Sequence, residues 1–134
     1  MKILFFPVLL LFLSACSGGS AGNEQLSGCD SLVVYFNTPL TDSVEKIVTT
    51  TEKKAIKKLA GFVNGKPSEA YKCGYDGNLM FYSQGSLKGD VSFNYSGDSC
   101  RHFMMMIENK LTPTTMSNEA ADFLKSLAEG KEWY

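Results

Sequence analysis

From Tyr71 to Glu108 the apolar side chains recur with a period of two, and this pattern limits the fold more than any other feature of the chain. Successive side chains of a β-strand point to opposite faces, so the pattern predicts antiparallel strands with one face toward a hydrophobic core. Asp76-Gly77, Gly85 and residues 96–99 predict the turns between these strands. The side chains expected on the core face are Leu79, Phe81, Val91, Phe93, Tyr95, Phe103, Met105 and Ile107.

Residues 41–65 precede these strands and have helical spacing. Asp42 and Glu45 form a pattern typical of a capping box, and Gly61 or Asn64-Gly65 is expected to end the helix. Three consecutive threonines lower the helix propensity, so packing must stabilise part of this helix. Its apolar stripe consists of Val44, Ile47, Val48, Thr51, Ala55, Ile56 and Leu59.

The remaining segments predict two strands and a second helix. Residues 31–37 are a β-branched and aromatic run, which indicates a buried strand. Residues 111–115 contain Pro113, which restricts them to an edge strand or a loop. Ser117 predicts the N-cap of a helix that ends at Gly130. The apolar stripe of this second helix is Ala120, Phe123, Leu124 and Leu127.

These elements predict an α+β fold in the order β-α-β-β-β-β-(β)-α. Both helices need a sheet face for their apolar stripes, so we expect a two-layer sandwich of 4–5 antiparallel strands with two helices on one face. The chain of 134 residues has room for one domain, and 44% hydrophobic and 20% charged residues are typical of a globular one.

The N-terminus has the pattern of an export signal. Lys2 precedes the apolar residues 3–13, a segment shorter than the roughly 20 residues that a membrane-spanning helix needs. Leu13-Ser14-Ala15-Cys16 follows and resembles the lipobox of bacterial lipoproteins. The resemblance implies cleavage of the signal peptide between Ala15 and Cys16. It also implies a diacylglyceryl group on the Cys16 sulfur and a further acyl chain, such as palmitate, on the new amino group.

Such a protein is anchored to the membrane, because two or three acyl chains hold a protein stably where one does not. Ser17, in place of aspartate, follows the cysteine and favours the outer membrane over the inner membrane under the family's sorting rule. The expected organisation is a signal peptide at residues 1–15, a lipidated Cys16 with a flexible Gly/Ser tether at residues 16–28, and one globular domain at residues 29–134.

Three cysteines remain after Cys16, and export to the periplasm places them where disulfides persist. We predict the bond Cys73–Cys100, because each cysteine lies near the end of a strand that can share one sheet. A bond from Cys29 to either of the others is the alternative. No C-x-x-C spacing supports zinc, so neither a metal nor another cofactor is expected.

Charge and motifs make two classes of function unlikely for this chain. The formal net charge is −1 and no basic stripe is present, so nucleic acid is not an expected partner. Lys53, Lys54, Lys57 and Lys58 lie at helical spacing and indicate a solvated helix side. His102, the sole histidine, lies mid-strand without a hydrolase motif around it, so an enzyme is not expected.

The second face of the predicted strands is the candidate binding face. It carries Met80, Tyr82, His102, Met104 and Met106, together with Ser92 and Asn94. This face is apolar for an open side, and methionine surfaces adapt to varied partners. The sequence therefore predicts a small envelope lipoprotein that acts as a binding or accessory module for an envelope protein or an apolar ligand.

Three alternatives remain beside this hypothesis. Tyr71-Lys72-Cys73, which opens a tyrosine-bearing hairpin, is similar to the small lysozyme-inhibitor lipoproteins; that family is an all-β barrel, whereas a long helix is predicted here. A Cu(I)-binding lipoprotein would use His102, Met104 and Met106, but these recur about 7 Å apart along a strand and need ligands from other strands. An enzyme of unknown type is the third.

Overall fold

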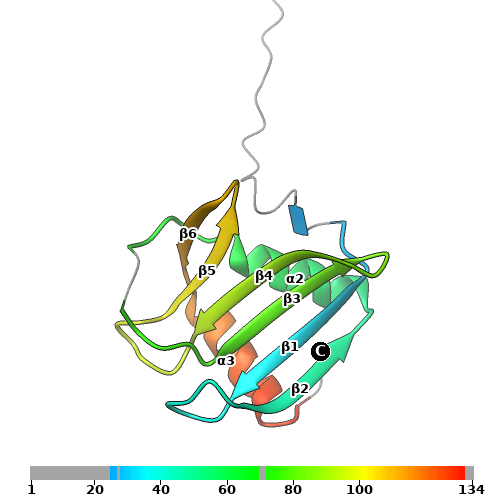
Figure 1. Cartoon of the computed structure of the whole chain (residues 1–134). Helices are drawn as coiled ribbons and strands as arrows, with labels where there is room; N and C mark the ends of the chain where they lie inside the picture. The colour runs from blue at the N-terminus through cyan, green and yellow to red at the C-terminus, as the bar shows by residue number, and fades with distance from the viewer. Residues whose placement is uncertain (1–24, 27, 70–71, 132–134) are drawn as a thin grey trace, which may run out of the picture.

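The computed structural model describes residues 25–26, 28–69 and 72–131. Within this part of the chain an open antiparallel sheet has the strand order β2-β1-β3-β4-β5-β6 (Figure 1). The elements are β1 (Ser31–Asn37), β2 (Val44–Thr50), α2 (Lys53–Val63), β3 (Gly77–Ser83), β4 (Ser86–Asn94), β5 (His102–Ile107), β6 (Lys110–Thr115) and α3 (Asn118–Ala128). The fold class is α+β as predicted, but the sheet has six strands instead of 4–5.

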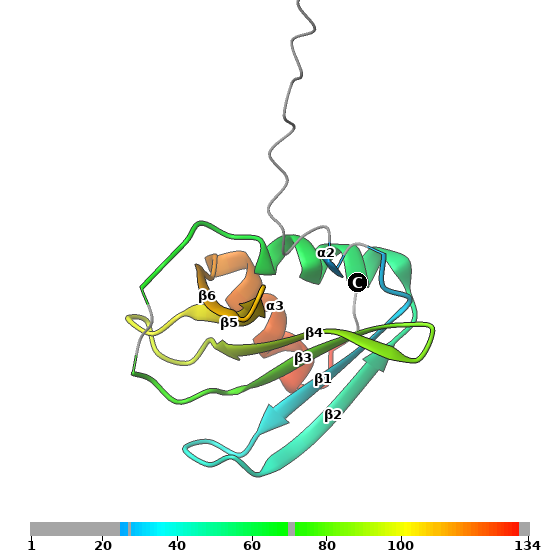
Figure 2. The same ribbon diagram turned by 45° about the horizontal axis from the view of Figure 1, so that its top comes forward.

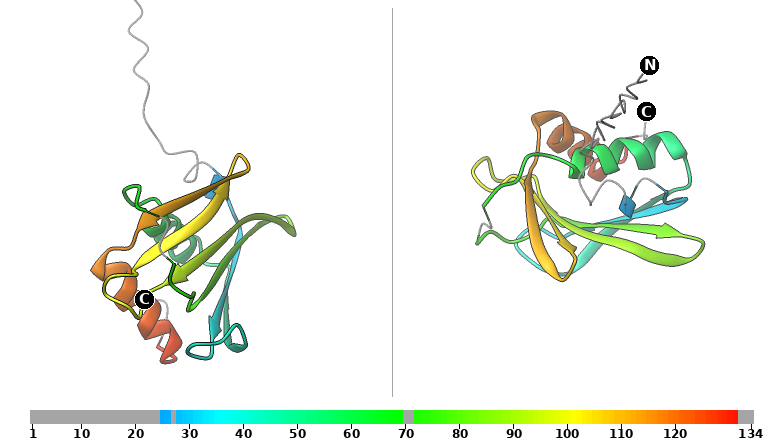
Figure 3. Two further views of the ribbon diagram at one scale, coloured as in Figure 1. Left: turned by 60° about the vertical axis from the view of Figure 1, so that its left-hand side comes forward. Right: turned by 90° about the horizontal axis from the view of Figure 1, so that it is seen from above.

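Helices α2 and α3 lie on the same side of the sheet, which leaves the opposite side without a helix (Figures 2 and 3). The core lies between the two layers, and the period-two pattern separates core from open positions as predicted in β3, β4 and β5. The strand side chains that are buried in this core are Leu32, Val34, Phe36, Leu79, Phe81, Val91, Phe93, Phe103 and Met105. We call the side of the sheet away from the helices the open face.

The prediction of one helix over residues 41–65 is wrong in its first half. Residues 44–50 form β2, in which Val48 lies opposite Val34 and Ile47 opposite Tyr35 of β1. The β-branched residues of this segment are stiff at χ1 and suit a pleated surface, so pairing with β1 prevails over the helical spacing.

The capping box is wrong with it, because Asp42 lies in the loop between β1 and β2. The helix begins only at Lys53. Just before it, the Thr50 hydroxyl accepts a hydrogen bond from the Glu52 N–H at 3.1 Å. From there the predicted stripe is confirmed, since Ala55, Ile56 and Leu59 are buried.

The predicted hairpin turn at Asp76-Gly77 is also wrong, because Gly77 is the first residue of β3. The chain instead turns at Gln84 and Gly85, whose φ angles are 50° and 78°. Gly77 is required for close packing: a Cβ atom there would lie 1.9 Å from the Tyr35 carbonyl oxygen of β1. The Asp-Gly pattern therefore marks a close approach of two strands and not a turn.

The C-terminal part agrees with the sequence. Glu108 and Asn109, with φ angles of 50° and 61°, turn the chain between β5 and β6. Pro113 lies in the edge strand β6. The Ser117 hydroxyl accepts a hydrogen bond from the Ala120 N–H at 3.1 Å and caps α3, as predicted.

The packed domain begins before Cys29, the boundary predicted from sequence. Leu26 has no exposed surface and packs on β4, where a Cβ atom at Gly89 would lie 2.3 Å from the Leu26 Cδ2. Part of the predicted tether therefore belongs to the domain.

The lipobox residues Ala15 and Cys16 lie outside the described residues. Among those described, no helix is both long and apolar enough to cross a membrane.

The connection from α2 to β3 passes around the β6 edge of the sheet (Figure 1). We call residues 64–69 and 72–76 the crossover segment. The Ser68 N–H donates to the Pro113 oxygen at 3.0 Å, and the Thr115 N–H donates to the Lys66 oxygen at 2.8 Å. The segment thereby pairs with the backbone of β6 and covers that edge.

A disulfide joins Cys73 of the crossover segment to Cys100, which confirms the predicted pair. Such a bond indicates an extracytoplasmic location.

Cys29 is buried and has no disulfide. Burial raises the pKa of its thiol, the Asp30 carboxylate raises it further and the Lys88 ammonium lowers it. A protonated, buried thiol is a weak nucleophile, so Cys29 is a structural residue.

Candidate functional site

Exposed apolar side chains gather on the open face of the sheet. In the described part of the chain, the large apolar side chains that are well exposed are Leu40, Val44, Ile47, Leu87, Met106 and Leu111. The strand register places all of these except Leu40 on the open face. Each of the five is between 48% and 59% exposed, so this face offers apolar surface from β2 to β6.

A bulge in β2 brings Val44 to this face. The register shifts between Phe36 and Asn37 of β1, so Phe36 lies opposite Lys46 whereas Asn37 lies opposite Val44. Glu45 is the extra residue of the bulge. Val44 and Ile47 therefore share the open face although their spacing does not fit a regular strand.

The five residues of the predicted binding face differ in their exposure. Met80 and Tyr82 are half-buried in the centre of the sheet, and Met106 is 51% exposed. In contrast, Met104 is 8% exposed and His102 is completely buried. The open face is thus accessible over β2, β1 and β3 and at the far end of β5, and it is covered at the start of β5.

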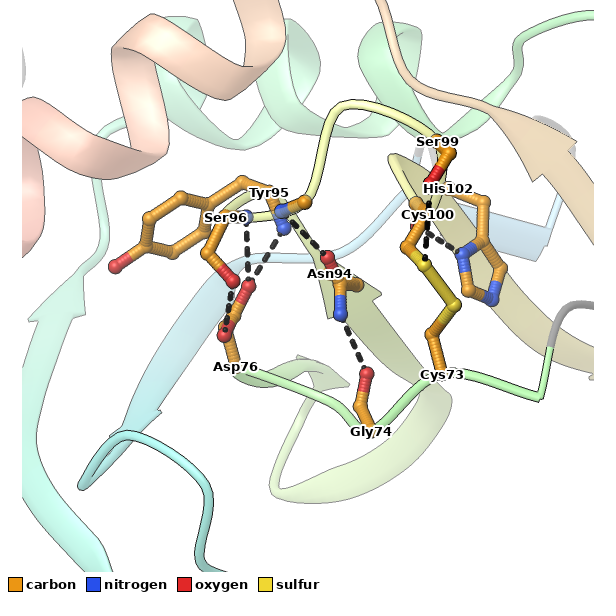
Figure 4. Close-up of a disulfide and its surroundings, with 10 residues drawn as sticks. Cys73, Gly74, Asp76, Asn94, Tyr95, Ser96, Ser99, Cys100 and His102 are labelled. Atoms are coloured by element: carbon orange, nitrogen blue, oxygen red, sulfur yellow. Dashed lines mark hydrogen bonds between the residues drawn. A yellow bond between two sulfur atoms is a disulfide. The ribbon is translucent and has the colours of Figure 1, made fainter.

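The crossover segment provides this cover (Figure 4). The Tyr75 ring lies with its centroid 5.8 Å from that of the His102 ring. The Asn94 amide donates to the Gly74 carbonyl oxygen at 2.6 Å, and His102 Nδ1 donates to the Cys100 carbonyl oxygen at 2.5 Å. His102 therefore lies buried beneath a disulfide-linked segment, with its Nδ1 bonded to the backbone, and the sequence did not indicate this cover.

A shallow hollow lies on the accessible part of the open face. Its volume is about 310 Å³, and it is lined by Tyr35, Asn37, Asp42, Val44, Tyr75, Asn78, Met80 and Asp90. The Asn78 amide donates to the Asp90 carboxylate at 2.8 Å and to the Ser92 hydroxyl at 3.1 Å. Two phenol rings and two carboxylates face this hollow, and neither lysine nor arginine lines it.

Asp76 positions the end of the crossover segment that carries Tyr75. One carboxylate oxygen of Asp76 accepts hydrogen bonds from the Tyr95 N–H at 2.7 Å and the Ser96 N–H at 2.9 Å. The other oxygen accepts from the Ser96 hydroxyl at 3.0 Å (Figure 4). The chain is thereby held against the loop after β4. The pKa of the Tyr95 hydroxyl is raised by burial first and by the Asp76 charge second.

Replacing Asp76 with alanine is expected to lower the free energy of unfolding by about 2 kcal/mol, because three hydrogen bonds to a charged acceptor are lost. Urea denaturation of the purified domain measures this. Asp98, in the loop after β4 that Asp76 contacts, is a matched control: its side chain is 94% exposed and contacts Arg101 at 3.2 Å. D98A is expected to cost under about 0.5 kcal/mol. Equal losses for the two variants would show that the Asp76 bonds do not hold the loop.

Several residues of the site were not predicted from sequence. Val44 and Ile47 were assigned to a helix, and Tyr35, Tyr75 and Asp90 were not considered. The β-branched run of residues 44–51 was the available signal for the strand. The hollow itself had no local signal, because β1, β2, β3, β4 and the crossover segment each contribute to it.

No protein-family model, curated protein or solved structure matches this chain. Among the described residues, histidine, cysteine, aspartate and glutamate form no group of three that could hold a metal ion. The sulfur of Cys100, a soft donor close to His102 in sequence, is in the disulfide and is not a free thiolate ligand for copper. The open face thus combines exposed apolar side chains with an acidic, aromatic hollow.

Proposed function

We propose that this protein is a lipid-anchored, non-catalytic binding module of the bacterial envelope. In this proposal its open face binds a partner protein that presents an apolar surface with a protruding lysine or arginine. One observation carries the proposal: five of the six well-exposed large apolar side chains among the described residues lie on this one face. Exposed apolar side chains that gather on one face in this way often mark interaction sites in soluble domains.

The spread of these side chains favours a protein over a small ligand. Ile47 lies on the edge strand β2, Leu87 at the start of β4 and Leu111 on the opposite edge strand β6. A small molecule in the hollow of about 310 Å³ would leave Leu87 and Leu111 in water. A protein surface can cover all of them, and burial of apolar area provides the driving force.

The charges on the face select for a basic group on the partner. Asp90 is the only charged side chain that the register pairs place on the open face, and Asp42 lines the same hollow. The aromatic residues Tyr35 and Tyr75 also line it. A lysine or arginine inserted into the hollow would gain carboxylate contacts and cation–π contacts.

The lipid anchor and the extracytoplasmic location in this proposal are supported by other observations. The lipobox at residues 13–16 supports lipid attachment at Cys16, with Ser17 favouring the outer membrane. The disulfide Cys73–Cys100 supports export from the cytoplasm. Together they favour a module whose open face is presented in the periplasm.

Site-specific photo-crosslinking in the producing cells tests the proposal. A photoreactive phenylalanine analogue is placed at Leu87 or Met106 on the open face, and at Lys125 on α3 as the control. The proposal expects the same partner to be crosslinked from both open-face positions and not from Lys125. The partner is then identified by mass spectrometry and purified for titration calorimetry.

Two substitutions define the chemistry of the contact. I47D is expected to weaken binding about 100-fold, because it removes an apolar contact and places an unpaired carboxylate in the interface. D90K, a charge reversal, is expected to weaken it at least tenfold, whereas the control D98K leaves it unchanged. An adduct of two copies of this chain, equal crosslinking from Lys125, or unchanged affinity of D90K would each contradict the proposal.

A further inference from the structure

The point at which the chain enters the domain is surrounded by lysines. Gly28, Cys29 and Asp30 line one surface hollow together with Lys53 and Lys57 of α2. Lys54 is the next exposed residue of α2, and the Gln25 side chain donates a hydrogen bond to the Lys88 carbonyl oxygen. We call Lys53, Lys54, Lys57 and Lys88 the basic cluster. Among the described residues, Asp30 and Glu52 are the acidic ones that line hollows together with these lysines.

Lys58, although close in sequence, has another role. Its ammonium group lies 4.6 Å from the centroid of the Phe123 ring of α3 and 5.9 Å from that of Phe62. It therefore takes part in the packing of α2 on α3. The lysines of the basic cluster have no such ring contact in the described structure and are exposed.

The entry point is held firmly on the helix side of the sheet. Leu26 is fully buried against Gly89, whose position in the register is opposite Phe81 of the core face. The first described residues, in blue, lie beside α2 in Figure 3. The basic cluster and the attachment of the N-terminal segment therefore share one side of the molecule, and the open face is on the other side.

The distance to the lipid is short. Gln25 follows Cys16 by nine positions, and a chain of that length spans at most about 30 Å when extended. The average end-to-end distance of a Gly/Ser-rich random coil with that number of residues is about 15–18 Å. This is about twice the Debye length of about 8 Å at physiological ionic strength, so the lysines come within reach of charged headgroups when the domain approaches the bilayer.

We infer that the basic cluster rests on the anionic phospholipid surface to which Cys16 anchors the chain. This orientation directs the open face away from the membrane, where it meets its partner. The inference rests on the lipid anchor of the proposed function. The basic cluster would then form a second contact with the membrane beside the lipid anchor. This contact is electrostatic, because the positive lysines on α2 face negative lipid headgroups.

Lysine footprinting of the mature lipidated protein tests this without mutation. The protein is reconstituted in nanodiscs of phosphatidylcholine alone or with 30% phosphatidylglycerol, and is acetylated briefly with a water-soluble ester. The four lysines of the basic cluster are expected to react at least threefold more slowly in the anionic discs. The internal controls Lys72, Lys110, Lys125 and Lys131 are expected to react equally in both, and 0.5 M salt is expected to abolish the difference.

A variant pair adds a second test. In K53Q/K54Q/K57Q the remaining Lys88 is expected to lose its protection, whereas K72Q/K110Q/K125Q is expected to retain it. Failure of the protein to co-elute with discs overturns the lipid anchor itself. Co-elution with no protection, with protection in both lipid mixtures, or with equal protection of all lysines overturns the inference alone.

Discussion

Replacing Gly77 with alanine is expected to lower the free energy of unfolding by at least about 3 kcal/mol, at the upper end of overpacking effects. The new Cβ atom would lie 1.9 Å from the Tyr35 carbonyl oxygen and 2.7 Å from the Phe93 ring. The first of these is backbone of the paired strand β1, which cannot move aside as a flexible side chain can. Strands β1 and β3 would have to separate at the centre of the sheet.

The effect should extend to the binding site, because Gly77 lies opposite Phe36, next to the Tyr35 and Asn78 of the hollow. Urea denaturation followed by circular dichroism measures the stability. Gly61 is the matched control: a Cβ atom there meets nothing within 4 Å, and the residue lies inside α2. G61A is expected to stabilise by about 0.5–1 kcal/mol. A G77A variant as stable as the wild type would refute the close approach of β3 to β1.

The second large effect is expected on removal of the disulfide. The double variant C73A/C100A should lose about 3–4 kcal/mol, since the bond closes a loop over a sequence separation of 27. The crossover segment should also open over β5, so that His102 becomes accessible to a histidine-modifying reagent. Thermal and urea unfolding with mass-spectrometric footprinting measure both effects.

Cys29 provides the control for this experiment. It is a buried thiol without a disulfide, and C29A removes only part of one small side chain. A loss of about 1 kcal/mol or less is expected, in line with small core truncations. If C73A/C100A kept both its stability and the burial of His102, the disulfide would not be what holds the crossover segment in place.

The strand assignments show where local sequence was sufficient. In β4 and β5 apolar residues at alternate positions face a single core, so Val91, Phe93, Phe103 and Met105 were assigned correctly. In α3 the Ser117 cap and the apolar stripe each predict a helix over the same residues, and the helix is found there. Such segments are predictable because their local propensity and their tertiary environment favour the same structure.

The errors lie where these two disagree. Residues 44–50 have apolar positions that fit a helix, yet they pair with β1, and this pairing decides their structure. Asp76-Gly77 has the composition of a turn, but its glycine serves a close strand contact and its aspartate binds a distant loop. Neither partner is adjacent in sequence, so neither could be read from the local pattern.

The chain's own residues determine the division of β3, β4 and β5 into core and open positions and the Cys73–Cys100 pair. They also predict export and lipid attachment at Cys16, and these stay predictions. These follow from short motifs and from the geometry of single strands. The tertiary structure decided the rest: the course of the crossover segment over His102, the addition of Val44 and Ile47 to the open face, and the assembly of the hollow. Each depends on contacts between residues far apart in the chain, and such contacts arise only when the sheet is complete.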